Sequence, residues 1–139
     1  MLVLDCNASM NIILESQEGK ALVELMKENE RVIVPDLYIA EIDSALSKHV
    51  RAGDFSLETA HTYLEQALGF VDEFIDMHEN YIEAFDEGVR NNHSTYDMFY
   101  LTLARRNGAT LFTLDRRLIA LCERLKIDCV HMVSLKESS

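Results

Sequence analysis

The sequence predicts an α/β protein, a three-layer α/β/α sandwich built on a mostly parallel central sheet. Short apolar runs alternate along the chain with longer stretches that carry apolar residues at helical spacing. No Asn-Gly or Asp-Gly hairpin turn joins two of the apolar runs. Strands that alternate with helices form parallel sheets, with the connecting helices on both faces.

The first half of the chain predicts two strands and four helices. A short buried strand is expected at Leu2–Leu4 and a second at residues 31–34, where Pro35 ends it. Asp36 is the expected N-cap of the next helix, and Ser56 of the helix after it. The four helices are expected at residues 7–14, 18–29, 37–53 and 56–68.

The second half predicts three helices, two strands and one ambiguous segment. Residues 70–77 fit a short strand or a helix, because Val71, Phe74 and Ile75 suit either. The helices are expected at residues 79–87, 94–106 and 116–125, and Asn107-Gly108 ends the second of them. The two strands are expected at residues 110–114 and 127–132.

Length and composition indicate one ordinary globular domain spanning residues 1–139. No apolar run reaches the roughly 18 residues that a membrane span needs, and the N-terminus does not resemble a signal peptide. Three cysteines without CxxC spacing indicate reduced thiols rather than disulfides or zinc ligands. We therefore expect a cytoplasmic protein with no membrane partner.

The charge is negative but unevenly distributed, with a formal net charge of −11. Residues 54–87 contain no Lys or Arg, whereas residues 105–126 are locally basic. The acidic stretch is interpreted as solvated helical faces, or as a surface for a basic protein segment. A protein of this composition is not expected to bind nucleic acid through a broadly basic surface. Any phosphate recognition is expected to be local and cation-assisted.

Four carboxylates lie at element boundaries, where a metal-dependent enzyme would place them. Asp5 ends the first strand, and Glu41 lies just inside the helix that Pro35-Asp36 opens. Asp97 begins a later helix, and Asp115 follows a later strand. Carboxyl ends of parallel strands and adjacent helix starts converge on one crevice. Carboxylates gathered there repel one another unless a divalent cation binds between them.

Oxygen ligands of this kind suit Mg²⁺ or Mn²⁺ and the chemistry of phosphodiester hydrolysis. A hard cation binds directly to one or two carboxylates, lowers the pKa of a bound water and polarises the phosphoryl oxygen. We expect Asp5 and Asp97 to bind the metal directly. Glu41 and Asp115 are expected to bind through water or to orient the nucleophile.

Three segments resemble the PIN-domain family. The opening MLVLDCNAS resembles the first strand with its terminal Asp, and VPDLYIAEIDSAL resembles the Pro-x-x-x-x-x-Glu segment. The stretch STYDMFYLTLARRNGATLFTLDRRL resembles the Tyr-Asp helix, Gly turn and Thr-x-Asp of the family. The resemblance spans nearly the whole chain and is weakest between residues 54 and 92. Two departures are Ser44, where many relatives carry Asn, and Met98, where a small residue is usual.

The resemblance implies a PIN-like α/β/α fold and a Mg²⁺- or Mn²⁺-dependent ribonuclease, of the kind found as VapC-like toxins in VapBC toxin–antitoxin pairs. The acidic quartet would be Asp5, Glu41, Asp97 and Asp115. Asn7 would support the metal or its water, and Thr113 would hydrogen-bond near Asp115. The implied partners are an RNA substrate, a cognate antitoxin and a second copy of the chain, for which the apolar helices between residues 18 and 50 offer an interface.

Each acid except Asp5 also has a purely structural explanation. Asp97 could complete a capping box with Ser94, and Asp115 could cap the helix that follows it. Glu41 could be a solvated residue at the rim of an apolar helical stripe. Asp5 is harder to explain, because an acid directly after a buried strand needs a partner.

Two other functions compete with the nuclease. A non-catalytic PIN-like interaction module is the main alternative, although it has no evident use for mutually repelling carboxylates. A phosphoryl-accepting receiver-like domain would need a second acid beside Asp5 and a Lys after a late strand, and neither is present. Of the remaining residues, His93 is the histidine most plausibly near a substrate, and Tyr96 is interpreted as core packing.

Overall fold

The computed structural model describes residues 1–26 and 30–130, and a five-stranded sheet crosses the middle of this part of the chain. The strand order is β3-β2-β1-β4-β5, and every neighbouring pair is parallel. The strands are β1 (Leu2–Leu4), β2 (Val32–Pro35), β3 (Glu73–Ile75), β4 (Thr110–Phe112) and β5 (Cys129–Val130). The prediction of a parallel sheet is therefore confirmed, with the first strand of the chain at its centre.

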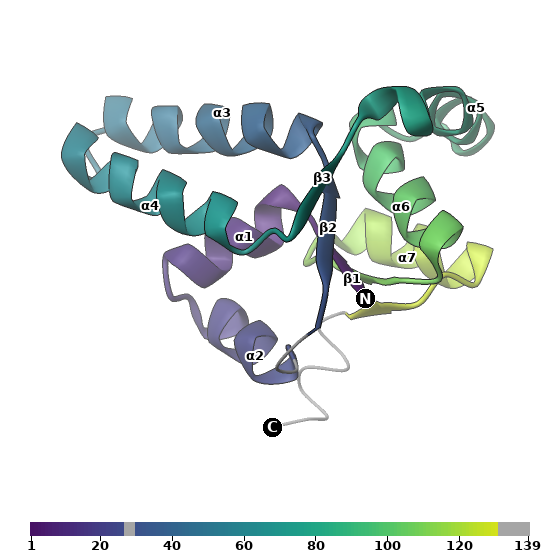
Figure 1. Ribbon diagram of the computed structural model, residues 1–139, viewed down its shortest axis with the longest axis horizontal. Helices are drawn as coiled ribbons and strands as arrows, with labels where there is room; N and C mark the ends of the chain where they lie inside the picture. The colour runs from purple at the N-terminus through teal and green to yellow at the C-terminus, as the bar shows by residue number, and fades with distance from the viewer. Residues whose placement is uncertain (27–29, 131–139) are drawn as a thin grey trace.

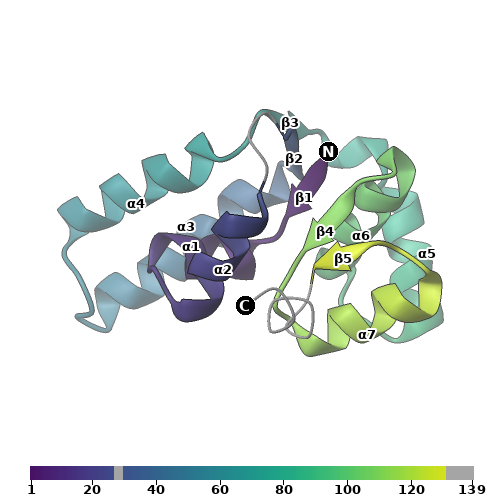
Figure 2. The ribbon, with the colours of Figure 1, turned by 90° about the horizontal axis from the view of Figure 1, so that it is seen from below.

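Helices cover both faces of this sheet and complete the three layers. Figures 1 and 2 show α1 to α4 on one side of the strands and α5 to α7 on the other. The helices are α1 (Cys6–Ile13), α2 (Gln17–Leu25), α3 (Leu37–Arg51), α4 (Leu57–Gly69), α5 (Tyr81–Asn91), α6 (Thr95–Asn107) and α7 (Arg116–Leu125), with a 3₁₀ turn at Met77–Glu79. The α/β/α prediction is confirmed.

Several element boundaries differ from those that the sequence predicts. The ambiguous segment 70–77 contains a strand, β3, because its backbone pairs with the open edge of β2. Pro35 lies within β2 as its last residue, rather than after it. The predicted ends of the second helix at Asn29 and of the last strand at Met132 lie outside the described residues, although α2 ends earlier, at Leu25.

The expected cap of α3 is not formed. Asp36 has helical backbone angles (φ −67°, ψ −12°), and its side chain accepts no capping hydrogen bond. Its backbone N–H instead donates to the carbonyl of Ile75 at 2.9 Å, which joins β2 to the edge strand. A capping side chain needs an extended backbone at the N-cap, and this sheet contact holds the residue in another conformation. Ser56 does cap α4, accepting from the Thr59 N–H at 3.1 Å.

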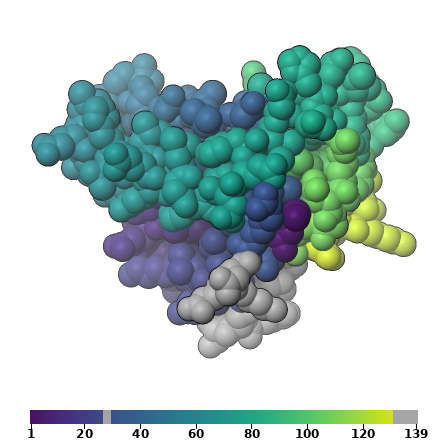
Figure 3. All heavy atoms as spheres, viewed as in Figure 1, coloured from purple at the N-terminus to yellow at the C-terminus, as the bar shows by residue number. Residues whose placement is uncertain are grey.

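The core lies between the sheet and both helical layers, and no residue of β1 is more than 1% exposed. Tyr38 of α3 is fully buried, and its hydroxyl donates to the Ala67 carbonyl of α4 at 2.7 Å, so the two helices are joined inside the protein. The α3–α4 arm projects to one side of the sheet (Figure 1). The surface is hollowed between this arm and α5 (Figure 3).

Two expectations from composition can be compared with the described residues. In that part of the chain no helix is long and apolar enough to cross a membrane. All three cysteines (Cys6, Cys122 and Cys129) are free thiols, as their spacing indicates.

Candidate active site

Asp5 lies at the carboxyl end of the central strand and begins α1. Its Oδ1 accepts a hydrogen bond from the Ala8 N–H at 2.8 Å, and the residue is only 6% exposed. Burial raises the pKa of Asp5 to about 7, against hydrogen bonds from Thr113 and Ala8 that lower it, and the charges of Asp97 and Glu41 raise it further. The fold therefore holds this carboxyl where its charged form needs a cation.

Glu41 lies in the second turn of α3 and is held by another helix. The hydroxyl of Tyr100, on α6, donates to its Oε1 at 2.6 Å. Burial raises the pKa of Glu41, the hydrogen bond from Tyr100 lowers it, and the charge of Asp97 raises it. A solvated rim residue would have no such buried partner, so that structural explanation is wrong.

Asp97 lies in the first turn of α6 but does not form a capping box. The Ser94 side chain makes no capping hydrogen bond. The Oδ2 of Asp97 instead contacts Nε2 of His93 at 2.9 Å, and the His93 side chain is 7% exposed. His93, expected near a substrate, thus has a buried side chain that positions this acid. The neighbouring Tyr96 is 61% exposed, so its interpretation as core packing is wrong: it lies on the outer side of the first turn of α6.

Asp115 begins α7 and caps it through its side chain. Its Oδ1 accepts from the N–H groups of Arg117 at 2.9 Å and Leu118 at 3.3 Å. Its own N–H donates to the Thr113 hydroxyl at 3.1 Å, as the resemblance implies. Thr113 is fully buried and also hydrogen-bonds to Asp5, so one side chain links two acids. The capping role is real and leaves Oδ2 without a capping bond.

One cleft of about 400 Å³ brings all four acids together. It is lined by Asp5, Cys6, Asn7, Met10, Glu41, Ala45, His49, Asp97, Tyr100 and Asp115. Asn7 is exposed at the start of α1, where it can reach a ligand in the cleft. Thr113 does not line the cleft and lies beneath it. The four carboxylates thus come from four different elements and meet at the carboxyl edge of the sheet.

The sequence did not single out Tyr100 or His49 as residues of the site. Tyr100 lies three residues after Asp97, and His49 eight residues after Glu41. Both spacings place the second residue on the same helical face as the acid. Helical spacing from each acid could therefore have indicated these two residues. The sequence does not show which helices face one another, so it could not place them in one cleft.

The donor set of the cleft fits a hard divalent cation. Its charged groups are carboxylates, and Asn7 adds an amide oxygen, which are ligands that Mg²⁺ and Mn²⁺ accept. Two of the acids have raised pKa values, partly through mutual repulsion that a cation would relieve. Within the described residues, no three acidic, His or Cys side chains already form a complete metal-ligand group. The cleft therefore supplies the right oxygens without a preassembled cage.

The parallel α/β/α fold and this acidic cleft together define a class of protein, and similarity to known proteins identifies it. The PIN-domain family model matches residues 2–124, so the chain belongs to the PIN-domain family. This confirms the resemblance carried by the three sequence segments.

Particular relatives and structural neighbours include a VapC protein, PAE2754 and two VapBC assemblies. The chain is 27% identical over 120 residues to "Ribonuclease VapC3" of Pyrobaculum aerophilum, covering 84% of this chain and 91% of that protein. PAE2754 of Pyrobaculum aerophilum has the same fold, with a TM-score of 0.73, 21% identity and coverage of 96% and 92%. VapBC2 of Rickettsia felis, solved with a DNA fragment of its promoter, matches with a TM-score of 0.66, 18% identity and coverage of 94% and 97%. VapBC-1 of nontypeable Haemophilus influenzae matches with a TM-score of 0.64, 15% identity and coverage of 94% and 96%.

Proposed function

We propose that this chain is a Mg²⁺- or Mn²⁺-dependent endoribonuclease that hydrolyses RNA phosphodiester bonds. The observation that carries the proposal is the convergence of four carboxylates on one cleft at the carboxyl edge of the sheet. The name of the VapC3 relative supports RNA as the substrate.

The residues of the cleft have distinct roles in this proposal. Asp5 and Asp97 hold the metal, while Glu41 and Asp115 act through water or orient the attacking water. When bound, the metal would lower the pKa of a water and polarise the phosphoryl oxygen. Asn7 would contact a water of the metal at the cleft entrance.

Neighbouring side chains hold these acids in place. The Tyr100 hydroxyl orients Glu41, and buried His93 orients Asp97. Thr113 hydrogen-bonds to the side chain of Asp5 and to the backbone N–H of Asp115, and so links the positions of the two acids. Each acid thus has a partner that fixes its direction before any substrate binds, which is the preorganisation that hydrolysis requires.

The test is cleavage of a structured RNA pool with Mg²⁺, with Mn²⁺ and with chelator. We expect cutting with either metal, none with chelator, and loss of cutting in Asp97→Asn. His78→Gln is the matched control, because the His78 side chain is 90% exposed outside the cleft. Metal-independent cutting, or full activity in Asp97→Asn, would contradict the assignment.

The alternative is a non-catalytic PIN-like interaction module. It predicts no cleavage and no metal binding. Isothermal titration with Mn²⁺ separates the alternatives, because a nuclease with a narrow substrate preference still binds the metal and a module without a metal site does not.

We further propose that the protein is the toxin of a type II toxin–antitoxin pair. Two structural neighbours are VapBC assemblies, which supports an antitoxin partner. Expression in a bacterial host is expected to arrest growth, and Asp97→Asn to relieve the arrest at equal protein level. We also propose a cytoplasmic location, which suits three free thiols, and a single domain over residues 1–139.

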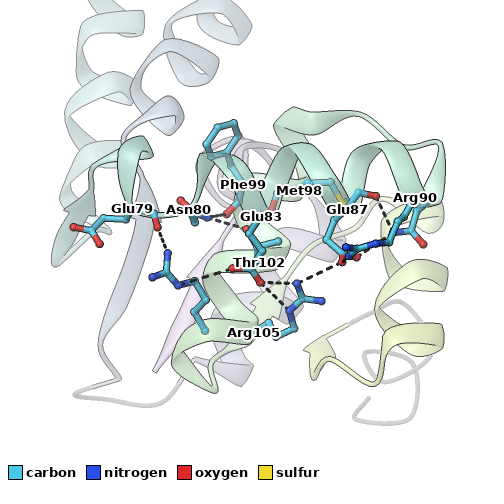
Figure 4. Close-up of polar contacts among 11 residues, drawn as sticks. Glu79, Asn80, Glu83, Glu87, Arg90, Met98, Phe99, Thr102 and Arg105 are labelled. Atoms are coloured by element: carbon cyan, nitrogen blue, oxygen red, sulfur yellow. Dashed lines mark hydrogen bonds and ion pairs between the residues drawn. The ribbon is translucent and has the colours of Figure 1, made fainter.

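A homodimer is part of the proposal, and α5 offers the surface for it. Two of its three acids face inward: Glu83 accepts from Arg105 of α6 at 2.5 Å, and Glu87 is 5% exposed (Figure 4). This corrects the expectation that the acids of residues 54–87 are all solvated. The outer face of α5 is apolar instead. The exposed residues are Tyr81 (50%), Ile82 (61%), Phe85 (62%) and Val89 (67%).

Such a face suits a second copy of the same chain. Glu83 and Glu87 of α5 are already paired with Arg105, so an interface on its outer face would not bury these two charges unpaired. Asp86 is exposed on α5 and would need to stay at the rim of such an interface. Exposed apolar clusters of this kind mark protein–protein contacts.

The surface expected between residues 18 and 50 is weaker, because Leu22, Tyr38 and Ile42 are buried in the core. Its exposed large apolar residues, Val23 (49%) and Ile39 (39%), lie on two different helices.

A further inference from the structure

We propose that His49 binds a phosphate of the RNA strand, next to the scissile phosphodiester, and so determines how the strand lies in the cleft. This rests on the proposed ribonuclease function. The inference adds a substrate-binding residue that the acidic quartet does not include.

The position of His49 indicates that the cleft extends well beyond the acids. Glu41, Ala45 and His49 line it from successive turns of α3. Eight residues of helix separate the first from the last, a rise of roughly 12 Å at about 1.5 Å per residue. The cleft is therefore long enough to hold more of the strand than the reacting phosphate.

The imidazole of His49 is held in one orientation by the loop that follows α3. Its Nδ1 lies 2.7 Å from Oδ2 of Asp54. Its ring stacks on Phe55, with centroids 5.4 Å apart and planes 23° apart. Phe55 in turn packs in a T-shaped arrangement with Tyr63, with ring centroids 5.1 Å apart. A residue needed only for helix formation would not require contacts on both its nitrogen and its ring face.

These contacts leave Nε2 for a ligand. With a proton on Nδ1, the ring donates a hydrogen bond to Oδ2 of Asp54, and no other described residue hydrogen-bonds to the ring. A protonated imidazole donates from both nitrogens, so Nε2 can then donate to a phosphate oxygen.

The charge of the cleft indicates why that ligand would be a phosphate. Four of the described lining residues are acids, and His49 is the one basic side chain among them. A strand entering the cleft meets repulsion near the acids wherever metal does not offset it. His49 is the place along α3 where a neighbouring phosphate finds an attractive partner instead.

A structural alternative is that His49 and Asp54 only close the α3–α4 turn. A His in the last turn of a helix also interacts favourably with the helix dipole. Substitutions that keep or remove the cation distinguish the two roles.

The experiment measures binding of single-stranded RNA oligonucleotides of mixed sequence in the Asp97→Asn background with Mg²⁺. His49→Ala is expected to weaken binding about tenfold and to lower the slope of log K against log salt by about 0.7, one phosphate contact. His49→Lys is expected to restore most of both, and His78→Ala to change neither. With Asp97 intact, His49→Ala is expected to raise KM while kcat stays within roughly twofold.

Each outcome decides the matter. Unchanged binding and salt slope in His49→Ala would overturn the inference. The nuclease proposal would still stand if the wild-type protein cuts RNA. Weakened binding with an unchanged slope and no rescue by Lys would assign His49 to the α3–α4 turn, which also overturns it. If binding depends on His49 but the wild-type protein neither cuts RNA nor binds Mn²⁺, the phosphate contact is supported and the nuclease proposal is contradicted. Absence of RNA binding by the Asp97→Asn protein, with no effect of His49→Ala on the KM of the wild-type protein, would overturn the inference and leave the nuclease to the cleavage assay.

Discussion

At the scale of single residues, the fold changes the chemistry of Asp5 more than its position in the sequence suggests. An acid after a strand is ordinary, but this one is buried beneath helices from both layers and beside two other acids. Burial raises its pKa to about 7, against 3.8 for the free side chain, so the fold without metal disfavours the charged carboxylate. Raised pKa values of this origin cluster at functional sites.

Asp5→Asn is expected to abolish metal-dependent cleavage and leave the fold intact. The Asn oxygen can still accept from the Ala8 N–H, so α1 keeps its cap, but the charge that attracts the metal is lost. Several kcal/mol of metal stabilisation correspond to a loss of at least about 100-fold in rate. Cleavage assays with circular dichroism check both parts, and retained activity would remove Asp5 from the mechanism.

The metal-free protein is expected to lose stability as the pH rises. Folded Asp5 holds its proton more tightly than the unfolded chain does, so its favourable contribution is complete below pH 3.8 and is lost as the pH rises through about 7. The full change is at most about 4 kcal/mol, from about three pH units at 1.36 kcal/mol each. The raised pKa of Glu41 acts in the same direction.

Urea denaturation in chelator between about pH 5 and pH 8 measures this dependence. Asp5→Asn is the control, because it cannot titrate and should show a shallower decline. Equal slopes for the two proteins would contradict the raised pKa.

At the scale of elements, helix starts both build this fold and carry its acids. Asp5 caps α1 and Asp115 caps α7, while Asp97 lies in the first turn of α6. The sequence predicted α7 at its observed bounds, because its cap and its apolar spacing agree. It gave the wrong cap for α3, since the contact of Asp36 with β3 depends on a strand that the sequence left ambiguous.

The two roles of Asp115 can be separated by substitution. Asp115→Ala removes a cap that bonds two N–H groups, and we expect a loss of about 1–2 kcal/mol together with reduced cleavage. Asp115→Asn keeps the accepting oxygen, so stability should stay within a few tenths of a kcal/mol while cleavage still falls. Thermal denaturation beside cleavage rates tests this, and equal activity in Asn and wild type would leave Asp115 as a cap only.

The close approach of α1 and α2 predicts a second effect. A Cβ at Gly19 would lie 2.0 Å from the carbonyl oxygen of Asn11, a backbone atom that cannot move freely. Gly19→Ala is therefore expected to destabilise the fold by about 1–3 kcal/mol or more. Gly69→Ala is the matched control, because a Cβ there meets nothing within 4 Å. Similar urea midpoints for the two variants would show that the helices separate easily.

At the scale of the whole molecule, the layers place the cleft and the α5 surface on different parts of the protein. The cleft receives residues from α1, α3, α6 and the start of α7, whereas α5 contributes none of the described lining. A dimer through α5 would therefore leave the acids accessible. Glu83 of α5 is paired with Arg105 of α6 on the inner side of α5 (Figure 4). The apolar residues Ile82, Phe85 and Val89 of the same helix are exposed.

Phe85→Lys is expected to convert the proposed homodimer into monomers without unfolding it. The residue is 62% exposed, so its change costs the protomer little, while a charge in an apolar interface is unfavourable. Analytical ultracentrifugation measures the outcome. Val23→Lys on α2 is the control, since Val23 is 49% exposed in the region where the sequence suggested an interface. Dissociation by Val23→Lys alone would restore that earlier expectation.

The sequence by itself determined the fold class and most helices, and it indicated which four acids lie at the element boundaries that meet in the cleft. These features depend on local periodicity, capping residues and the ends of short apolar runs. It also indicated the family, which the match over residues 2–124 confirms. Only the tertiary structure decided that Tyr100 holds Glu41, that His93 is buried against Asp97 and that His49 lines the cleft. It also decided that α5 turns its apolar face outward. These features depend on which helices face one another across the sheet, and that is set by packing between residues far apart in the chain.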